Sequence, residues 1–268
     1  MTLAEIAEAT GISYGSAHAV LTVELGMSKV CARWVPKLLT PEMRRTRMQT
    51  CQQLLRLSQS NQEEFLDSIV TGDESMFSLY EPETKAQSMQ WKRPDEPPPL
   101  KAKTVPSVKK RMGTIFWDNQ GVLLIEWLPE KRTVTGDSYV ATLHQLKQAI
   151  KEKRRGKVTR GVRLLHDNAS AHTCHKTQAA IRELGFTQLP HPAHSPDLAP
   201  SDFWLFPALK NPLRGRHWPS VTALASSVHQ WCKHQEENWF AVGIAKLPER
   251  WAKCVAVHGD YVEKVQDE

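Results

Sequence analysis

The first part of the chain has the hydrophobic spacing of two short amphipathic helices. Apolar residues follow Thr2 at helical intervals, and the Thr2 hydroxyl can cap the first helix. Gly11 can adopt the left-handed conformation of a turn, and Ser13 can cap the second helix. This pattern predicts a helix-turn-helix DNA-binding segment over residues 1–30, with an ordinary helical hairpin as the open alternative.

The second helix of such a unit carries its contact residues near its amino-terminal end, where it enters the major groove of DNA. We therefore predict DNA contacts from the polar and aromatic residues at that end, which are Ser13, Tyr14, Ser16 and His18.

A short apolar stretch between prolines follows and ends at Pro41. Thr40 can cap a helix that begins at Pro41, because proline suits the first helical position. This helix should end near Ser58. Residues 31–62 are therefore predicted to form a linker followed by a helix.

From Phe65 onward the spacing becomes that of a mixed α/β domain. The predicted elements are a strand at 71–80, a hairpin at 113–127, a helix at 139–153, a strand at 162–167, a helix at 171–184, a strand at 186–189 and a helix at 203–213. Hairpin order followed by β-α-β-α order predicts a mixed sheet flanked by helices, which suits a ribonuclease H-like fold over residues 63–268. The proline-rich stretch at about 81–107 is too long for a plain hairpin loop, which indicates a functional excursion.

The composition narrows the class of protein. The chain has 268 residues, 40% of them hydrophobic, which suffices for a sizeable core. No apolar run approaches the roughly 18 residues that cross a bilayer, and the N-terminus lacks the pattern of a secretory signal, so we expect no membrane partner. The five scattered cysteines, none in a Cys-x-x-Cys pair, favour a reducing compartment.

Positive charge is concentrated in two runs, 101–111 and 147–163, in a chain of net charge +6. Such runs are compatible with solvated loops and helix faces. They are equally compatible with contacts to DNA phosphates, which position a duplex without reading its sequence. We predict phosphate contacts from the basic residues that end the first run, which are Lys109, Lys110 and Arg111.

Three aspartates lie at the edges of predicted elements. Asp73 lies in the first strand, Asp167 ends the strand at 162–167, and Asp202 opens the helix at 203–213. Carboxylates are the ligands that Mg²⁺ prefers, and two such ions about 4 Å apart can activate a nucleophile and stabilise the leaving oxygen of a phosphodiester. Any one of these aspartates could be only a turn or a helix cap. Together they predict a two-metal site in which Asp167 bridges the ions.

Two other arrangements compete with this site. Asp197 competes with Asp202, but the prolines around it indicate a rigid turn in which its carboxylate bonds the backbone. The pairs His172-x-x-His175 and His191-x-x-His194 lack a cysteine pair at zinc-finger spacing. We expect some of these histidines to line the groove near the carboxylates. No glycine-rich phosphate loop is present in the sequence, which argues against nucleotide hydrolysis.

The chain resembles the mariner family of DNA transposases along nearly its whole length. The motifs that carry the resemblance are Ala32-Arg33-Trp34-Val35-Pro36, Val70-Thr71-Gly72-Asp73-Glu74, His166-Asp167-Asn168-Ala169, Ser195-Pro196-Asp197-Leu198-Ala199-Pro200-Ser201-Asp202 and Leu247-Pro248-Glu249-Arg250-Trp251. The gap of 34 residues between Asp167 and Asp202 is similar to the spacing within the family's catalytic triad.

This resemblance implies a cut-and-paste transposase of the nucleus with Asp73, Asp167 and Asp202 as catalytic metal ligands. Such enzymes bind terminal inverted repeats as homodimers, cleave double-stranded DNA with two Mg²⁺ or Mn²⁺ ions, and join the 3′-hydroxyl to a TA target. The resemblance also implies that the excursion at 81–107 is a clamp loop, that Arg33 contacts DNA, and that Trp34, Val35 and Pro36 lie at the dimer contact.

Family members usually carry another helix-turn-helix before the point at which this chain begins, so we expect this chain to lack it. Two hypotheses from different classes follow. The first is an active metal-dependent DNA transposase and endonuclease. The alternative is an inactive or repurposed transposase remnant that still binds DNA. A fragment of a longer gene product is a third possibility.

Overall fold

The computed structural model describes residues 1–32, 34–100, 109–130, 132–236 and 238–262. The chain divides into two units, Met1–Pro36 and Lys37–Glu268. The helix predicted together with the linker belongs to the second unit, where it packs against the last helix. The predicted contact residue Arg33 and the end of the predicted excursion, from residue 101, lie outside the described residues.

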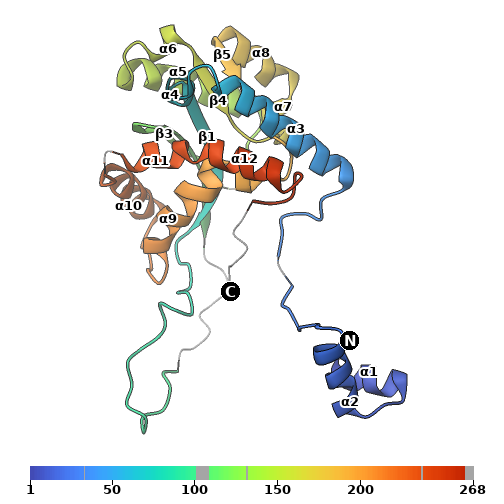
Figure 1. Cartoon of the computed structure of the whole chain (residues 1–268). Coiled ribbons are helices and arrows are strands. Elements are labelled where there is room, and N and C mark those ends of the chain that lie inside the picture. The colour runs from blue at the N-terminus through green and yellow to red at the C-terminus, as the bar shows by residue number, and fades with distance from the viewer. Residues whose placement is uncertain (33, 101–108, 131, 237, 263–268) are drawn as a thin grey trace. The chain divides into compact units, whose positions relative to one another are not determined.

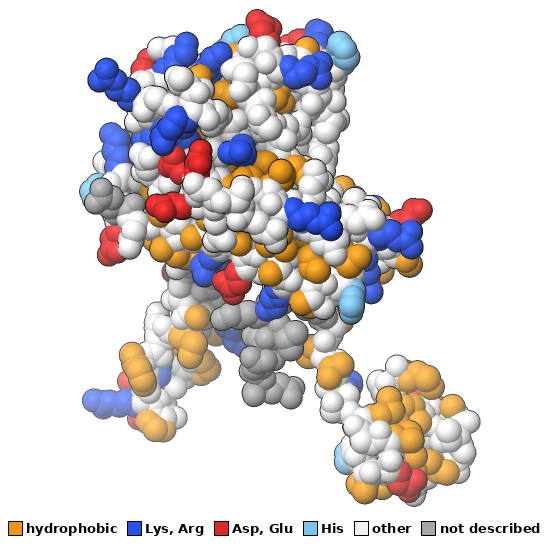
Figure 2. Space-filling model, turned by 45° about the horizontal axis from the view of Figure 1, so that its top comes forward, with side chains coloured by type: hydrophobic (Ala, Val, Ile, Leu, Met, Phe, Trp, Pro, Cys, Tyr) orange, Lys and Arg blue, Asp and Glu red, His pale blue; other side chains and the backbone are white. Residues whose placement is uncertain are grey.

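The first unit owes its helices to local capping. Its elements are α1 (Leu3–Thr10), α2 (Tyr14–Ala19) and the π-helical turn η1 (Val20–Glu24). The Thr2 hydroxyl accepts a hydrogen bond from the Glu5 backbone, and the Glu5 carboxylate accepts one from Thr2 N, which completes a capping box. Gly11 has a φ of 70° at the turn, and Ser13 caps α2, as predicted. Hydrophobic side chains lie at the surface of this unit (Figure 2), among them those of Ile12, Tyr14, Val23, Leu25 and Met27.

The second unit is built on a five-stranded mixed sheet in the order β3-β2-β1-β4-β5 (Figure 1). The strands are β1 (Ile69–Ser78), β2 (Lys110–Asp118), β3 (Gly121–Trp127), β4 (Val162–Leu165) and β5 (Phe186–Gln188). The first three strands are antiparallel neighbours, whereas β1, β4 and β5 run parallel. The antiparallel strands β1 to β3 are therefore followed along the chain by strands that alternate with helices, as the sequence predicted.

Alternation along the central strand separates two hydrophobic cores. Ile69 faces one core and its neighbour Val70 faces the other, because successive strand side chains point to opposite faces. The first core lies against α3, α4 and the helices from α9 onward, and the second lies against α5 and α8. The described helices of the second unit, including the short α6 and α7, have the following bounds: α3 (Pro41–Ser58), α4 (Gln62–Asp67), α5 (Gly136–Lys153), α6 (Lys157–Arg160), α7 (Ser170–Thr173), α8 (His175–Glu183), α9 (Phe206–Lys210), α10 (Val221–Lys233), α11 (Trp239–Ala245) and α12 (Leu247–Ala256).

Two predicted helices are corrected by the structure. The helix predicted at 171–184 is interrupted at Cys174, whose extended backbone (ψ 153°) separates α7 from α8. The helix predicted to follow Asp202 instead begins with the π-helical turn η3 (Ser201–Leu205), so Asp202 lies inside the first turn. Pro207 explains this start, because it has no N–H to donate to the carbonyl four residues before it. The remaining short turns are the 3₁₀ segments η2 (Pro196–Leu198) and η4 (Asn211–Leu213).

A membrane span needs a helix that is both long and apolar. Across the ranges that the structure describes, no helix meets both conditions.

Candidate active site

Asp73 and Asp167 are brought together by the parallel pairing of β1 with β4. Thr71 lies opposite Leu165 in that pairing, and its hydroxyl donates a hydrogen bond of 3.0 Å to the Leu165 carbonyl oxygen. Each aspartate lies two residues beyond this pair along its own segment. Both carboxylates therefore lie at the carboxyl end of β4, where ligand sites of parallel strands form.

Asp202 reaches the same place from η3 on the other side of a loop. Its neighbour Ser201 is buried and accepts a hydrogen bond of 3.1 Å from Trp117 Nε1 on β2, which ties η3 to the sheet. The carboxyl groups of Asp73 and Asp202 lie close enough for each to influence the pKa of the other. Three acidic side chains from three separate segments thus converge at one edge of the sheet.

The convergence leaves negative charge without an equal positive partner. Burial raises the pKa of Asp73 well above its usual value, and repulsion from Asp202, Glu74 and Asp167 adds to that rise. Burial and repulsion from Asp167 also raise the pKa of Asp202, although its interaction with Asp73 and the charge of Lys210 oppose the rise. Protonation of Asp73 would relieve this repulsion, and a bound cation would relieve it more completely.

Asp167 differs because it is held by donors. Its Oδ1 lies 2.6 Å from His172 Nδ1 and accepts a 3.0 Å hydrogen bond from the backbone N–H of Ala169. Burial raises the pKa of Asp167, but these hydrogen bonds outweigh burial and lower it. Asp167 is therefore an anion whose direction is fixed by the loop that follows β4.

His172 connects Asp167 with the opposite face of the sheet. It is buried, and its Nε2 lies 3.5 Å from Glu74 Oε1, an ion-pair distance longer than an ordinary hydrogen bond. Burial lowers the pKa of His172, but the contacts with Asp167 and Glu74 prevail and raise it to about 9. His172 is thus an imidazolium between two carboxylates at neutral pH. The expectation that some histidines lie beside the carboxylates is confirmed for His172.

Glu74 faces away from Asp73, as strand alternation predicted. Asp73 pairs with Ile115 on β2, which belongs to the core beneath α9–α12. Glu74 pairs with Thr114, whose hydroxyl donates a long hydrogen bond of 3.4 Å to it on the α5 side. The neighbouring carboxylates of Asp73 and Glu74 therefore lie on opposite faces of the sheet.

The rings of His166, which is neutral, and Tyr139 lie beside the His172 ring and support it. The Tyr139 hydroxyl lies 2.9 Å from His166 Nδ1, and the two rings are nearly parallel at 3°. Burial and repulsion from His172 lower the pKa of His166 to about 3, so it stays uncharged. The sequence did not reveal this support, because an aromatic residue at helical spacing in α5 has the pattern of an ordinary core residue.

The carboxylates suit a hard divalent cation in chemistry, since they offer oxygen ligands and unbalanced negative charge. Among the described residues, however, no three His, Cys, Asp or Glu side chains already stand in a common ligand arrangement. His172 occupies one oxygen of Asp167, and one oxygen of Asp73 accepts a 2.7 Å hydrogen bond from the Glu74 N–H. Each carboxylate has a second oxygen, but the side chains must move closer together before they can share a cation.

Asp197, the competitor of Asp202, has a different role in the structure. It is fully buried and makes a two-armed ion pair with Arg47 of α3, in which Nη2 lies 2.6 Å from Oδ2 and Nη1 lies 2.9 Å from Oδ1. Its Oδ2 also accepts a 2.9 Å hydrogen bond from Val262 N, a backbone group far along the chain and not one in the turn where the bond was predicted. No local pattern in the sequence indicates the distant partner Arg47.

The predicted DNA contacts of the first unit lie at its surface. Ser13 and Ser16 are engaged with each other, because Ser13 Oγ accepts from Ser16 N at 3.1 Å and lies 2.9 Å from Ser16 Oγ. Tyr14 and His18 are exposed and line a cavity of about 830 Å³ within that unit. Their role in DNA binding stays a prediction.

The basic residues at the start of β2 are partly used by the fold. Lys109 and Lys110 are exposed, but Arg111 donates a 3.1 Å hydrogen bond to the Leu128 carbonyl oxygen. The predicted dimer contact is also at the surface, since the Trp34 side chain is 95% exposed, Pro36 is exposed and Val35 is half-buried.

Comparison with known proteins identifies relatives of this chain. The family model described as a transposase with a partial DDE domain matches residues 81–160. The Mariner Mos1 transposase of Drosophila mauritiana is 35% identical over 242 residues, which make up 90% of this chain and 69% of that protein. The histone-lysine N-methyltransferase SETMAR of Homo sapiens is 32% identical over 98% of this chain, which corresponds to 38% of SETMAR.

Solved structures of Mos1 share the same architecture. The Mos1 mariner paired end complex with Mn superposes with a TM-score of 0.84 at 33% identity, over 98% of this chain and 76% of that one. The Mos1 strand transfer complex gives a TM-score of 0.82 at 34% identity, over 98% and 75% of the two chains. The predicted ribonuclease H-like fold is therefore confirmed. Because Mos1 shares this identity and fold over most of both chains, the chain belongs to the mariner family of transposases.

Proposed function

We propose that this chain is a metal-dependent DNA transposase that binds terminal inverted repeats, cleaves DNA strands and joins the 3′-hydroxyl ends to TA target DNA. The convergence of Asp73, Asp167 and Asp202 from three separate segments carries this proposal. The solved Mos1 complexes, a paired end complex with Mn and a strand transfer complex, support the substrate and the metal.

The three aspartates would hold two Mg²⁺ or Mn²⁺ ions, with Asp167 between them and Asp73 and Asp202 each completing one ion. When bound, such a pair of ions supplies activation of the attacking water or 3′-hydroxyl and stabilisation of the leaving oxygen. The protein's own contribution is positional. His172 holds one oxygen of Asp167 and leaves the other available, and the hydrogen bond from Trp117 to Ser201 holds η3, which carries Asp202, against the sheet.

We propose DNA and a second copy of the chain as partners. The exposed helix-turn-helix unit supports DNA binding through Tyr14 and His18. Large apolar side chains that are almost fully exposed support self-association, and they are Trp34 in the linker and Trp91 in the excursion. Because its substrate would be chromosomal DNA, we propose that the protein acts in the nucleus.

Metal removal tests this function. Purified protein is expected to nick supercoiled plasmid DNA in Mn²⁺, because the acidic cluster then has its counter-ion. Excess EDTA should stop nicking within the mixing time, and renewed Mn²⁺ should restore it, as followed on agarose gels. Plasmid binding without nicking under every metal condition would instead support the DNA-binding remnant.

His172 offers a test of how Asp167 is held. Replacing His172 with alanine removes the 2.6 Å contact with Asp167, so we expect the Mn²⁺ concentration for half-maximal nicking to rise about 10- to 100-fold. His172→Asn is expected to recover much of this loss, because its amide N–H can reach the same carboxylate oxygen. The measurement is a Mn²⁺ titration of nicking with Mn²⁺ binding followed by calorimetry. Equal Mn²⁺ affinity in all three proteins would show that His172 does not orient Asp167.

A further inference from the structure

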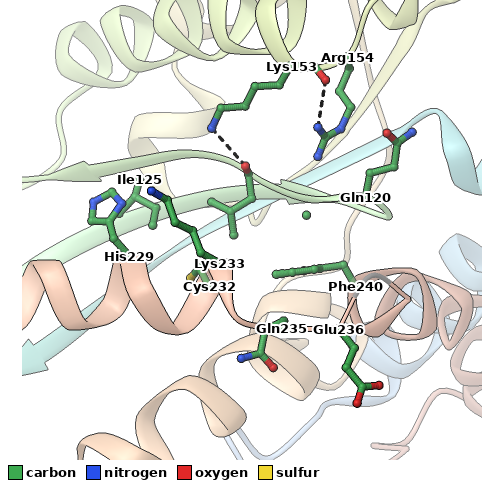
Figure 3. A pocket seen from close by; sticks show the side chains of 12 residues that line it. Gln120, Ile125, Lys153, Arg154, His229, Cys232, Lys233, Gln235, Glu236 and Phe240 are labelled. Carbon is green, nitrogen blue, oxygen red and sulfur yellow. Dashed lines mark hydrogen bonds between the residues drawn. The ribbon is translucent and has the colours of Figure 1, made fainter.

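A pocket of the second unit lies against the sheet, away from the three aspartates. Its volume is about 390 Å³, within the range of small-ligand sites. It is formed by the β2–β3 turn, the edge strand β3, the end of α5, and the segment from α10 into α11 (Figure 3). Its polar and charged lining residues are Gln120, Lys153, Arg154, His229, Lys233, Gln235 and Glu236, and none of the three aspartates is among them.

Positive charge gathers on one side of this pocket. Figure 3 shows the ammonium groups of Lys153 and Lys233 and the imidazole of His229 near strand β3, whereas the Glu236 carboxylate points away from them. Neither lysine makes an ion pair with a residue that the structure describes. Burial and repulsion from Arg154 and Lys233 lower the pKa of Lys153. These cations therefore lack a fixed anionic partner.

Lys153 and Arg154 are nevertheless held in place by the fold. Lys153 Nζ donates to the carbonyl oxygens of Val122 at 3.3 Å and Leu123 at 2.8 Å on the edge strand. An ammonium group has three N–H donors, so one remains for a ligand. Arg154 is fixed by Asp118, which bonds both its Nε and its Nη2 at 3.0 Å.

The balance of charge behind the pocket is also positive. Buried Asp118 neutralises one charge but contacts two cations, Arg154 and the buried Lys157, whose Nζ lies 2.8 Å away. This trio therefore has a net charge of +1, which adds to the charges of the two pocket lysines, Lys153 and Lys233. A compact anion with several acceptor oxygens matches such a set of donors, and phosphate is the anion that a DNA-binding protein meets.

We propose that this pocket is a second phosphate-binding site, which takes a nucleotide-sized part of a DNA strand outside the catalytic centre. The choice of DNA rests on the proposed function, and on the basic run at 147–163, which continues along α5 and α6 from the pocket. A free nucleotide or inorganic phosphate offers the same chemistry. The experiment therefore includes all three.

His229 provides a reporter inside the pocket. Burial and the charges of Lys233 and Lys153 lower its pKa, so a bound phosphate should raise that pKa. The measurement is NMR titration of the His229 ring protons in EDTA, with the signal assigned from His229→Gln. A single-stranded oligonucleotide is expected to raise the His229 pKa at micromolar concentration, whereas AMP and inorganic phosphate should need millimolar concentration. Tighter binding of AMP than of the oligonucleotide would overturn the assignment to DNA, and no response to any of the three would overturn the site.

Two double variants distinguish binding in the pocket from a general effect of positive surface charge. In Lys153→Gln/Lys233→Gln, oligonucleotide affinity at about 150 mM salt should fall about fivefold or more, and the salt dependence of log K should become shallower by about 0.7 for each phosphate that the variant no longer binds. The control Lys176→Gln/Lys253→Gln removes the same charge from exposed positions on α8 and α12, outside the basic run, and should leave the His229 response unchanged. An equal response in both pairs would overturn the proposal.

The outcome is independent of catalysis because metal is absent from these measurements. A His229 response in a protein that never nicks DNA would support the pocket while the proposed transposase activity failed. Nicking without any His229 response would reject the pocket alone.

Discussion

Asp167→Asn is expected to lower Mn²⁺-dependent nicking by at least about 1000-fold. Asp167 would contact both ions, and losing its charge should cost several kcal/mol of transition-state stabilisation, at about 1.4 kcal/mol for each factor of ten. Asparagine keeps an oxygen that can accept from His172 and from the Ala169 N–H, so the loop should keep its course. Initial rates of plasmid nicking measure the loss.

A matched aspartate controls this experiment. Asp137 is 77% exposed and its ion pair with Lys176 lies at the surface, so Asp137→Asn should nick DNA at the wild-type rate. Circular dichroism should show thermal midpoints for both variants close to that of the wild type. Full nicking by a folded Asp167→Asn protein would remove the basis for the proposed metal centre.

Arg47→Ala is expected to destabilise the second unit by about 3–5 kcal/mol. It leaves the Asp197 carboxylate buried without its counter-charge, and breaking such a pair costs this much. The substitution also removes hydrogen bonds from Arg47 to the carbonyl oxygens of Gly259 at 2.8 Å and Asp260 at 3.1 Å. The second unit has a size at which each kcal/mol lowers the midpoint by about 2–4 °C, so a fall of roughly 10 °C should appear in thermal unfolding.

Arg44 lies one turn earlier on the same helix and serves as the control. Its side chain is 49% exposed, and it approaches Asp260 only at 3.6 Å, so Arg44→Ala should cost less than about 1 kcal/mol. The combined variant Arg47→Met/Asp197→Leu should recover part of the stability, because no buried charge then remains unpaired. Equal midpoints for Arg47→Ala and Arg44→Ala would contradict the role given to the buried pair.

The ion pair also bears on the catalytic site. Asp197 lies five residues before Asp202, and the 3₁₀ turn η2 and the π-helical turn η3 connect the ion pair with the carboxylate. Anchoring this loop to α3 and to the segment after α12 holds the start of η3 in place. Spacing and context favoured Asp202 over Asp197 in the sequence, and the buried position of Asp197 supplies the physical reason for that preference.

Local signals explain which elements could be predicted. Helix α3 begins at Pro41 and ends at Ser58, as expected. Its start could be predicted because the capping residue Thr40 and the proline at the first helical position are adjacent in the sequence. The turn between β2 and β3 was also recoverable, since glycine at 121 adopts a φ of 130° that other residues avoid. The break at Cys174 could not be foreseen, because nothing in the residues before it differs from a continuous helix.

The sequence by itself determined the helix caps, the alternation of the strands and the choice of the three candidate aspartates, because each of these depends on residues close together in the chain. The expected edge position was wrong for Asp73, which lies in the middle of β1. The tertiary structure alone decided the partners of those residues. The contacts of His172 with Asp167 and Glu74 and of Arg47 with Asp197, and the repulsion between Lys153 and Lys233, all arise from the fold. Charge interactions act through space and not along the chain, so their partners and their effect on pKa become defined only when the sheet and its helices are packed.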